Sequence, residues 1–186
     1  IYGDDGADTI TANTDTTGSM VIYGGDGADS ITGAKGDVAA DGDVIYGGLG
    51  NDTLLGRDGD DTISGGVGND SITAGSGASI LVGGDGADTM SSNSEMGSTA
   101  DNITFTGGDG ADEFVLQLAN KTGALMSAVA TISDFEVGVD KISVGSGFFE
   151  VGSPSLDTVG SDGLSTTTNS IEVFHATSGH TVVHMN

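Results

Sequence analysis

The stretch Gly24-Gly25-Asp26-Gly27-Ala28-Asp29-Ser30-Ile31-Thr32 decides the fold of this chain, because its pattern recurs through the first 115 residues. The pattern is Gly-Gly-x-Gly-x-Asp-x-U-x, in which U is a large apolar residue. Full copies follow at Gly47–Leu55, Gly65–Thr73, Gly83–Ser91 and Gly107–Val115. Weaker copies at 3–11, 56–64 and 74–82 carry Asp4 or Arg57 in place of the second Gly, or Ser79 in the Asp position. A fixed period of nine residues predicts a repeat architecture in which each unit packs on its neighbours.

The lengths of the successive units indicate how the repeats are arranged. From residue 3 to residue 115 the units have 9, 12, 9, 14, 9, 9, 9, 9, 9, 15 and 9 residues. The three long units, 12–23, 33–46 and 92–106, are all even-numbered. Because random insertions would not respect this parity, we expect odd and even turns on opposite edges of a structure. Its full coil then consists of two nonapeptide units.

Each unit is predicted to form a turn of six residues followed by a strand of three. Gly allows the positive φ angles that such turns need. The strand alternates with a period of two, so the apolar residue at position eight, such as Ile31 or Leu54, points inward, and Thr or Ser points outward. Two stacks of these short strands predict an all-β fold, a parallel β-roll of about six coils over residues 1–115.

The nonapeptide resembles the repeat of RTX (repeats-in-toxin) proteins. The segment Ile132-Ser133-Asp134-Phe135-Glu136-Val137-Gly138-Val139-Asp140-Lys141-Ile142 is also similar to the I-x-D-F-x-x-G-x-D-x-I segment that often follows RTX rolls. The resemblance implies a right-handed parallel β-roll over residues 1–115, followed by a closing segment and a β-rich C-terminal cap over 116–186. It also implies type I secretion in an unfolded state and a location outside the cell or on a bacterial surface.

The cap is expected to be built from four short strands. The predicted strands are Ile142–Val144, Phe148–Val151, Ile171–Phe174 and Thr181–His184, and Asn120–Ala130 is predicted to be a loop. Phe135, Phe148 and Phe149 are candidate plugs for the open end of the core, because terminal repeats need a cover.

The charge of the chain excludes several classes of partner. There are 28 Asp plus Glu against four Lys plus Arg, for a net charge of −24. Neither nucleic acid nor anionic lipid is expected to bind such a chain. No apolar run of membrane-spanning length occurs, and the absence of Cys excludes disulfides and thiolate metal sites. Because the chain begins at Ile1, it is interpreted as a fragment of a longer protein.

Calcium is the cation that these residues favour. Asp outnumbers Glu by 23 to five, and Asp holds a short carboxylate close to a turning backbone. Stacking the repeats brings these carboxylates together across adjacent coils, and a divalent cation would reverse the repulsion. Ca²⁺ accepts about six to eight oxygen ligands in a flexible geometry, whereas Zn²⁺ prefers His or Cys, which the repeats lack.

The Asp residues at position six form two predicted ligand rows. On the even edge Asp43 and Asp61 are two nonapeptide units apart and predict one ion, with Ser79 weakening the next position. On the odd edge six turns define five gaps, and therefore five ions. About five to six Ca²⁺ ions or more are expected in all. The odd row consists of Asp8, Asp29, Asp52, Asp70, Asp88 and Asp112.

The resemblance adds two further sets of candidate ligands. Asp134 and Asp140 match the acidic positions of the closing segment and are expected beside Asp112. In the RTX family the carbonyl groups of the Gly-rich turn complete the calcium shell. This implicates Gly24, Gly47, Gly65, Gly83 and Gly107.

No catalytic motif is found, and we expect no enzyme activity in this chain. There is no G-x-S-x-G elbow and no thiol nucleophile. His180 and His184 have the i, i+4 spacing of zinc helices, but the Glu of that motif is replaced by Thr181, and the intervening Thr and Val residues favour a strand. These histidines and His175 are therefore expected to be ordinary surface or edge residues.

Three functions are compatible with these features. The first is a structural part of a bacterial surface-layer protein or adhesin. Its partner is calcium, and a second partner is either another copy of the chain, through self-assembly, or a cell-surface glycan. The second is the non-catalytic secretion and folding module of an exoenzyme, a protease or a lipase. The third is the receptor-binding repeat region of a toxin. We favour the first, because Thr and Ser cover the predicted faces and no catalytic residues are found.

Overall fold

The computed structural model describes residues 1–12, 18–35, 42–92, 102–116, 130–144, 171–175 and 181–185. Within these residues the regular structure is all strand, and no helix that could cross a bilayer is found among them. The strands are β1 Tyr2–Asp5, β2 Thr9–Thr11, β3 Val21–Asp26, β4 Ser30–Thr32, β5 Val44–Leu49, β6 Thr53–Asp58, β7 Thr62–Val67, β8 Ser71–Ser76, β9 Ile80–Asp85, β10 Thr89–Ser91, β11 Ile103–Asp109, β12 Glu113–Leu116, β13 Ala130–Ile132, β14 Lys141–Val144, β15 Ile171–His175 and β16 Thr181–Met185.

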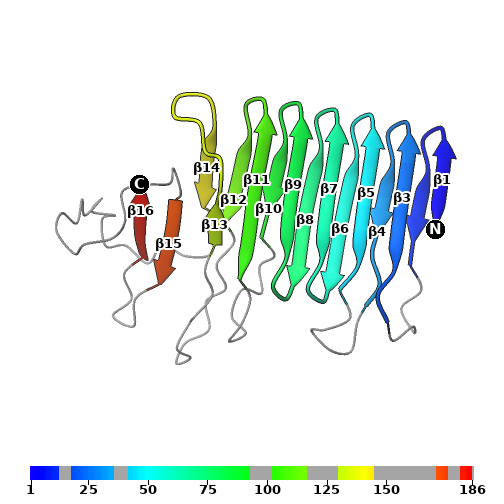
Figure 1. Ribbon diagram of the computed structural model, residues 1–186, viewed down its shortest axis with the longest axis horizontal. Helices are drawn as coiled ribbons and strands as arrows, with labels where there is room; N and C mark the ends of the chain where they lie inside the picture. Colours follow the sequence, from blue (N-terminus) through cyan, green and yellow to red (C-terminus); the bar gives the residue numbers. More distant parts are fainter. Residues whose placement is uncertain are drawn as a thin grey trace.

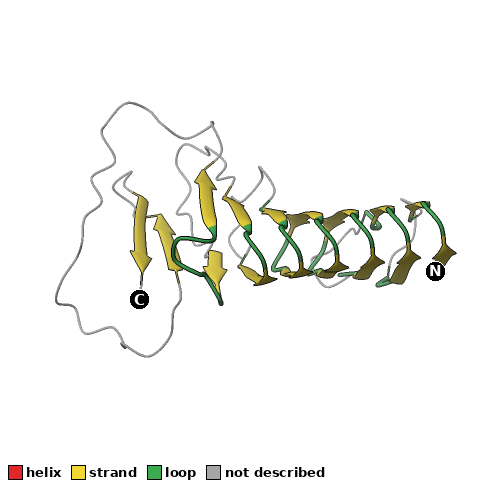
Figure 2. Cartoon of the chain, turned by 90° about the horizontal axis from the view of Figure 1, so that it is seen from above, coloured by secondary structure: helices red, strands yellow, loops and turns green. Residues whose placement is uncertain are grey.

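The strands alternate between two parallel ladders, which lie as two layers along the length of the chain (Figures 1 and 2). Sheet A has the order β1-β3-β5-β7-β9-β11-β13-β15-β16, and sheet B has the order β2-β4-β6-β8-β10-β12-β14. Pairing is parallel from β1 to β13 in sheet A and throughout sheet B. Only β15 and β16 join antiparallel. The predicted all-β parallel roll is therefore confirmed.

The two edges of the roll differ as the unit lengths predicted. Every odd-numbered strand up to β11 is followed by a turn of three residues; β3 ends at Asp26, for example, and β4 begins at Ser30. The long insertions all lie in the connections β2–β3, β4–β5 and β10–β11, which join an even strand to the next odd one. The edge at which each odd strand turns into the next even strand, called the odd edge here, is the upper edge of the roll in Figure 1.

The division of the nonapeptide into turn and strand differs from the prediction. Strands β3 and β5 to β9 each have six residues, so the Gly-Gly-x part of the repeat continues the strand and the turn has only three residues. Pairing with neighbouring coils explains the difference, because Gly25 pairs with Gly48 and Gly48 with Gly66. Gly48 holds a φ of +121° inside this ladder, a conformation that glycine adopts without strain.

The core is a double row of apolar side chains between the two sheets. Position eight is buried as predicted, with Ile10 at the N-terminal end only partly covered. Phe105 and Phe114 meet edge to face with ring centroids 5.9 Å apart, and Phe135 packs on Phe114 at 6.2 Å. Sheet A contributes Ile22, Ile45, Ile63, Leu81, Phe105 and Ile132, and sheet B contributes Ile31, Leu54, Ile72, Met90 and Phe114.

Three of the four strands expected after residue 140 are present as β14, β15 and β16. Strand β13 was missed; it is held in sheet A by parallel pairing of Ala130–Ile132 with β11. The predicted strand at 148–151, nearly all of the predicted loop at 120–130, and His180 lie outside the described residues. The β-rich cap therefore stays a prediction, and the side chains of β15 and β16, with His175 and His184, also lie outside the description.

Candidate metal centre

The six odd-edge aspartates form one continuous row across the coils. Each stands at the end of a three-residue turn, immediately before an even-numbered strand. The backbone N–H of Asp29 donates to Oδ1 of Asp52 at 2.8 Å, and Asp52 donates in the same way to Asp70. The same bond links Asp8 to Asp29, Asp70 to Asp88 and Asp88 to Asp112. The predicted row is therefore in register, with the insertions absorbed on the other edge.

The second carboxylate oxygen of these residues, Oδ2, has a different environment. In the described part of the chain it is buried and receives no hydrogen bond in seven aspartates, the six of the odd row and Asp61. A buried carboxylate oxygen without a donor loses hydration and gains nothing in return. A row of such atoms is the arrangement that a bound cation would stabilise.

A glycine carbonyl from the next coil lies beside each of the first five odd-edge Oδ2 atoms. A Cβ built on Gly24 would meet both Asp29 Oδ2 and the carbonyl oxygen of Gly47, the latter at 2.5 Å. The same cradle recurs at Gly3, Gly47, Gly65 and Gly83. The five carbonyl groups belong to Gly24, Gly47, Gly65, Gly83 and Gly107, which are the glycines that the RTX resemblance implicated.

Gly3 was not among the expected site residues, and the row ends differently at Gly107. Gly3 stands at position one of a weak copy of the repeat, and this position was the signal that could have identified it. At Gly107 the atoms nearest to a Cβ would be those of the Asp112 carboxylate and the ring of Phe114 at 3.1 Å, and no carbonyl of a following coil is among these three nearest atoms. Gly107 therefore differs from the five earlier positions, where a glycine carbonyl is one of the nearest atoms.

The even edge repeats this arrangement with fewer members. Asp43 N–H donates to Asp61 Oδ1 at 2.8 Å, and Asp61 N–H donates to the Ser79 hydroxyl at 3.2 Å. Gly56 faces Asp61 Oδ2 and the carbonyl of Ala74. Asp43 differs because its Oδ2 accepts a hydrogen bond from Ala34 N–H at 2.7 Å. Asp61 is thus the even-edge residue that matches the odd row, and Asp43 matches it only in part.

Asp134 and Asp140 both lie at the end of the roll, beside the last repeat. Asp134 accepts from the N–H groups of Gly107 and Gly108, each at 2.9 Å. Asp140 Oδ1 accepts from Asp112 N–H at 3.0 Å, and its Oδ2 accepts from Glu136 N–H at 2.7 Å. Asp140 therefore continues the row of Asp112, but all four oxygens of this pair already have backbone donors.

Burial raises the pKa of four carboxyls of the odd row, those of Asp52, Asp70, Asp88 and Asp112, and of Asp61 on the even edge. The pKa is raised to about 6 for Asp52 and Asp88 and to about 7 for Asp61, with loss of hydration as the largest cause. Hydrogen bonds from the backbone oppose this rise, and the charges of neighbouring row members add to it. The pKa values of Asp70 and Asp112 are raised in the same way. Ionising these five carboxyls is therefore costly unless a cation lies next to them.

The donor set fits calcium. Among the described residues, no three side chains of Asp, Glu or His converge on one point. An ion at this edge would therefore combine one or two carboxylates with backbone carbonyl groups, which is a ligand set that Ca²⁺ takes readily. The row has no His or Cys, so Zn²⁺ does not fit.

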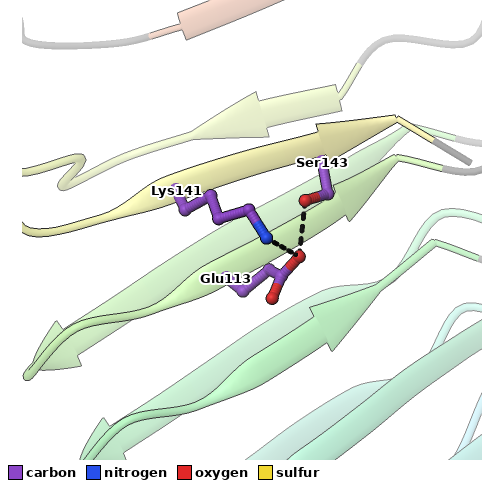
Figure 3. A network of polar contacts seen from close by, with 3 residues as sticks. All are labelled: Glu113, Lys141 and Ser143. Atoms are coloured by element: carbon purple, nitrogen blue, oxygen red, sulfur yellow. Dashed lines mark hydrogen bonds and ion pairs between the residues drawn. The ribbon is translucent and has the colours of Figure 1, made fainter.

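A separate polar network joins the closing segment to the last repeat (Figure 3). Glu113 of β12 accepts from Lys141 Nζ at 2.8 Å and from the hydroxyl of Ser143, both in β14. These hydrogen bonds lower the pKa of Glu113. Glu113 and Lys141 occupy register positions that hold Thr or Ser in the earlier coils, so the network specifies the pairing of β12 with β14.

A family model for the RTX calcium-binding nonapeptide repeat matches the chain in four copies, at residues 1–16, 21–37, 39–72 and 64–94. Neither the curated proteins nor the solved structures gave a match. The matched residues span strands β1 to β10. They contain both even-edge aspartates and the first five members of the odd row.

Proposed function

Because this chain belongs to the RTX calcium-binding nonapeptide repeat family, we propose that residues 1–115 form a structural module that folds around calcium outside the cell. RTX repeats bind Ca²⁺ in general and form β-rolls in secreted proteins, and the roll itself is not catalytic. Residues 116–186 serve as its closing segment and β-rich cap. The proposal rests on the seven buried Oδ2 atoms that lack a donor within the described chain.

The ligand assignment follows from the cradles. Five ions lie between successive odd-edge turns, each held by Oδ2 of one Asp and by the glycine carbonyl of the next coil. A further ion lies on the even edge at Asp61, where the carbonyl of Ala74 takes the place of the glycine carbonyl. For Asp134 and Asp140, the backbone hydrogen bonds favour closing the row beside Asp112 over holding an additional ion.

Calcium concentration then controls where the module folds. Extracellular calcium modules bind at about 10⁻⁴–10⁻³ M, well above the calcium level of a cytosol. A ligand that binds only the folded chain stabilises it by mass action. The chain remains unfolded during type I export and folds once calcium is available, as part of a surface-layer protein or adhesin. Self-assembly or a cell-surface glycan is its further partner.

A matched pair of substitutions in one nonapeptide tests the ligand assignment. Asp88 belongs to the buried row, whereas Asp85 stands three residues earlier and is exposed. Asp88→Asn keeps an acceptor for the N–H of Asp70 but removes the charge next to the carbonyl of Gly107. We expect Asp88→Asn to raise the calcium midpoint of folding by about three- to tenfold and to remove one bound ion in titration calorimetry.

Asp85→Asn is the control and should leave both the midpoint and the ion count unchanged. Equal effects of the two substitutions would contradict the assignment, because they would mean that general negative charge, and not the buried row, attracts the ion.

A further inference from the structure

One turn on the even edge departs from the repeat pattern at two positions only. It belongs to the degraded copy at residues 74–82, which has Ala74 at position one and Ser79 at position six. The other positions of the pattern are kept, including the glycines Gly75 and Gly77. The two changed positions are the ones that supply the glycine and the carboxylate of each cradle in the metal centre.

The backbone of this turn is that of a calcium-binding turn. Gly75 and Gly77 both have a φ of +117°. Gly48 and Gly50 hold the same positions in a full copy of the repeat, and their φ values are +121° and +118°. The chain path of the site is thus retained, and the difference from the other turns lies in side chains.

The methyl group of Ala74 takes the place that glycine leaves open in the cradles. Ala74 lies in register with Gly56, where a Cβ would meet both Asp61 Oδ2 and the carbonyl of Ala74 itself. A Cβ on Gly47 would lie 2.5 Å from the carbonyl oxygen of Gly65, which is about the distance at which Ca²⁺ binds an oxygen ligand. Ala74 carries this methyl group and is fully buried, so the group occupies the position of an ion.

Ser79 supplies the hydrogen bond of a row aspartate but not its second oxygen. Asp61 N–H donates to the Ser79 hydroxyl at 3.2 Å, as Asp43 N–H donates to Asp61 Oδ1 at 2.8 Å. Ser79 is buried, and its hydroxyl is not among the buried side-chain atoms of the described chain that lack a hydrogen-bond partner. Position 79 therefore offers no uncompensated carboxylate oxygen for a cation to neutralise.

Either replacement would leave a defect without the other. An Asp at position 79 beside Ala74 would bury a charged oxygen against a methyl group, which is costly when no partner is present. A Gly at position 74 beside Ser79 would leave an empty space at a buried site. Ala74 and Ser79 together fill the space and leave no buried oxygen without a partner.

We infer that Ala74 and Ser79 together form a metal-free substitute for a calcium site, which ends the even-edge row of ions at Asp61. The inference rests on the proposed function, because it concerns which turns of the roll take calcium. Asp70 and Asp88, in the odd-edge turns before and after this one, keep their cradles. The coils at this point are therefore held by ions on the odd edge and by direct packing on the even edge.

The next coil still offers what a restored site needs. Ser91 pairs with Thr73, so Ser92 follows Ala74 in the register column. The carbonyl oxygen of Ser92 accepts from the Ser91 hydroxyl at 3.0 Å and has a second lone pair. Ile103 follows Ser79 at position six, so the next coil supplies no carboxylate there. The Asp61 site has the same property, because Ser79 is the residue that follows it.

Two substitutions and their combination test the inference. Ala74→Gly with Ser79→Asp converts residues 74–82 into a full copy of the nonapeptide. Titration calorimetry should count one more calcium ion in this double variant than in the wild-type chain, and no more ions in either single variant. Ser79→Asp alone should raise the calcium midpoint of folding at least about twofold, because its carboxylate is buried without an ion, and adding Ala74→Gly should reverse the rise.

Ala74→Gly with Ala78→Asp is the matched control. It adds the same charge to the same turn, but at position five, where the preceding even-edge turn carries the exposed residue Asp60. The control should bind no additional ion, because a carboxylate at this position is not part of a cradle.

Circular dichroism in calcium checks that each variant has formed the roll. An extra ion in Ser79→Asp alone or in the control overturns the inference and leaves calcium-dependent folding intact. So does a double variant that gains no ion or does not fold. A wild-type chain that binds no calcium overturns the proposed function as well.

Discussion

At the scale of single residues, the metal site depends on glycines that have no side chain to place between coils. Gly47 is one of them, because a Cβ there would meet Asp52 Oδ2 and the Gly65 carbonyl, the latter at 2.5 Å. This requirement is distinct from backbone conformation, since Gly47 is not among the residues with a positive φ. The cradle is thus maintained by the absence of a methyl group, and it disappears when one is added.

We therefore expect Gly47→Ala to remove one calcium ion and to destabilise the calcium-loaded roll by about 1–3 kcal/mol, as overpacking of a close-packed site does. Gly6→Ala is the control, because Gly6 has a φ of +119° but no atom within 4 Å of its Cβ position. It should lower stability through backbone strain while keeping the full ion count in titration calorimetry. Retention of every ion in Gly47→Ala would contradict the cradle.

Arg57 and Asp4 show what happens where the second glycine of the repeat is replaced. Both adopt a positive φ, +79° for Arg57 and +70° for Asp4, which strains any residue with a Cβ. The roll is nevertheless continuous through both positions, because β1 and β6 pair with their neighbours there. The sequence could not show this, since the loss of a glycine also fits a break in the repeat.

At the scale of the elements, the odd-edge row links all coils through one type of hydrogen bond and one type of buried oxygen. The charge states of Asp52 and Asp88 in this row, and of Asp61 on the even edge, depend on pH. The pKa values of Asp52 and Asp88 are raised to about 6 and that of Asp61 to about 7, because burial removes hydration. In the unfolded chain these groups titrate near 3.9. Between about pH 4 and about pH 7 the folded state therefore binds more protons than the unfolded state does.

Without calcium, the stability of the roll should consequently fall as the pH rises from about 4 to about 7. We expect the calcium-free chain to gain β-structure on acidification from about pH 8 to about pH 5, since protons neutralise the buried row. The calcium midpoint should rise over the same interval, because protons and Ca²⁺ compete for Oδ2. Circular dichroism in excess chelator, and calcium titrations at each pH, measure the two effects. A calcium-free spectrum that does not change across this range would be inconsistent with raised pKa values.

The aspartate row and the two different edges of the roll could be predicted from the sequence, because the spacing of the Asp residues alone determines them. Asp52, Asp70 and Asp88 follow one another at intervals of two nonapeptide units, and the other gaps differ only by the even-edge insertions. The length of the strands could not be predicted in this way, because Gly-Gly is a turn signal by local propensity. Neighbouring coils hold Gly25, Gly48 and Gly66 in the ladder, and that pairing overrides the propensity.

At the scale of the whole molecule, the roll is polar at both edges and its apolar core is narrow. Such a fold has little hydrophobic surface to bury in each repeat, and its buried carboxylates oppose folding in the absence of a cation. The closing segment is built differently, since Asp134 and Asp140 take backbone N–H groups as partners and Glu113 pairs with Lys141. The repeat region, rather than this segment, is therefore where calcium should decide folding.

Parts of this arrangement could not be predicted from the sequence, and the reason is physical. Strand β13 has three residues and pairs with β11 on one side and with β15 on the other, which are contacts between distant parts of the chain. The stacking of Tyr2, Tyr23 and Tyr46 on sheet A also emerges only from register, because these residues are each separated by more than two nonapeptide units along the chain. Long-range pairing of this kind leaves no local signal.

Circular dichroism of the whole chain, recorded in excess EGTA and again after calcium is added in stages, tests the central claim most directly. A largely disordered spectrum in EGTA is expected to convert cooperatively to a β spectrum near the calcium levels found outside cells. Magnesium at the same concentrations should not replace calcium, since it prefers a tighter octahedral shell and keeps its water. A β spectrum that is the same in EGTA and in calcium would contradict a fold that depends on the ion.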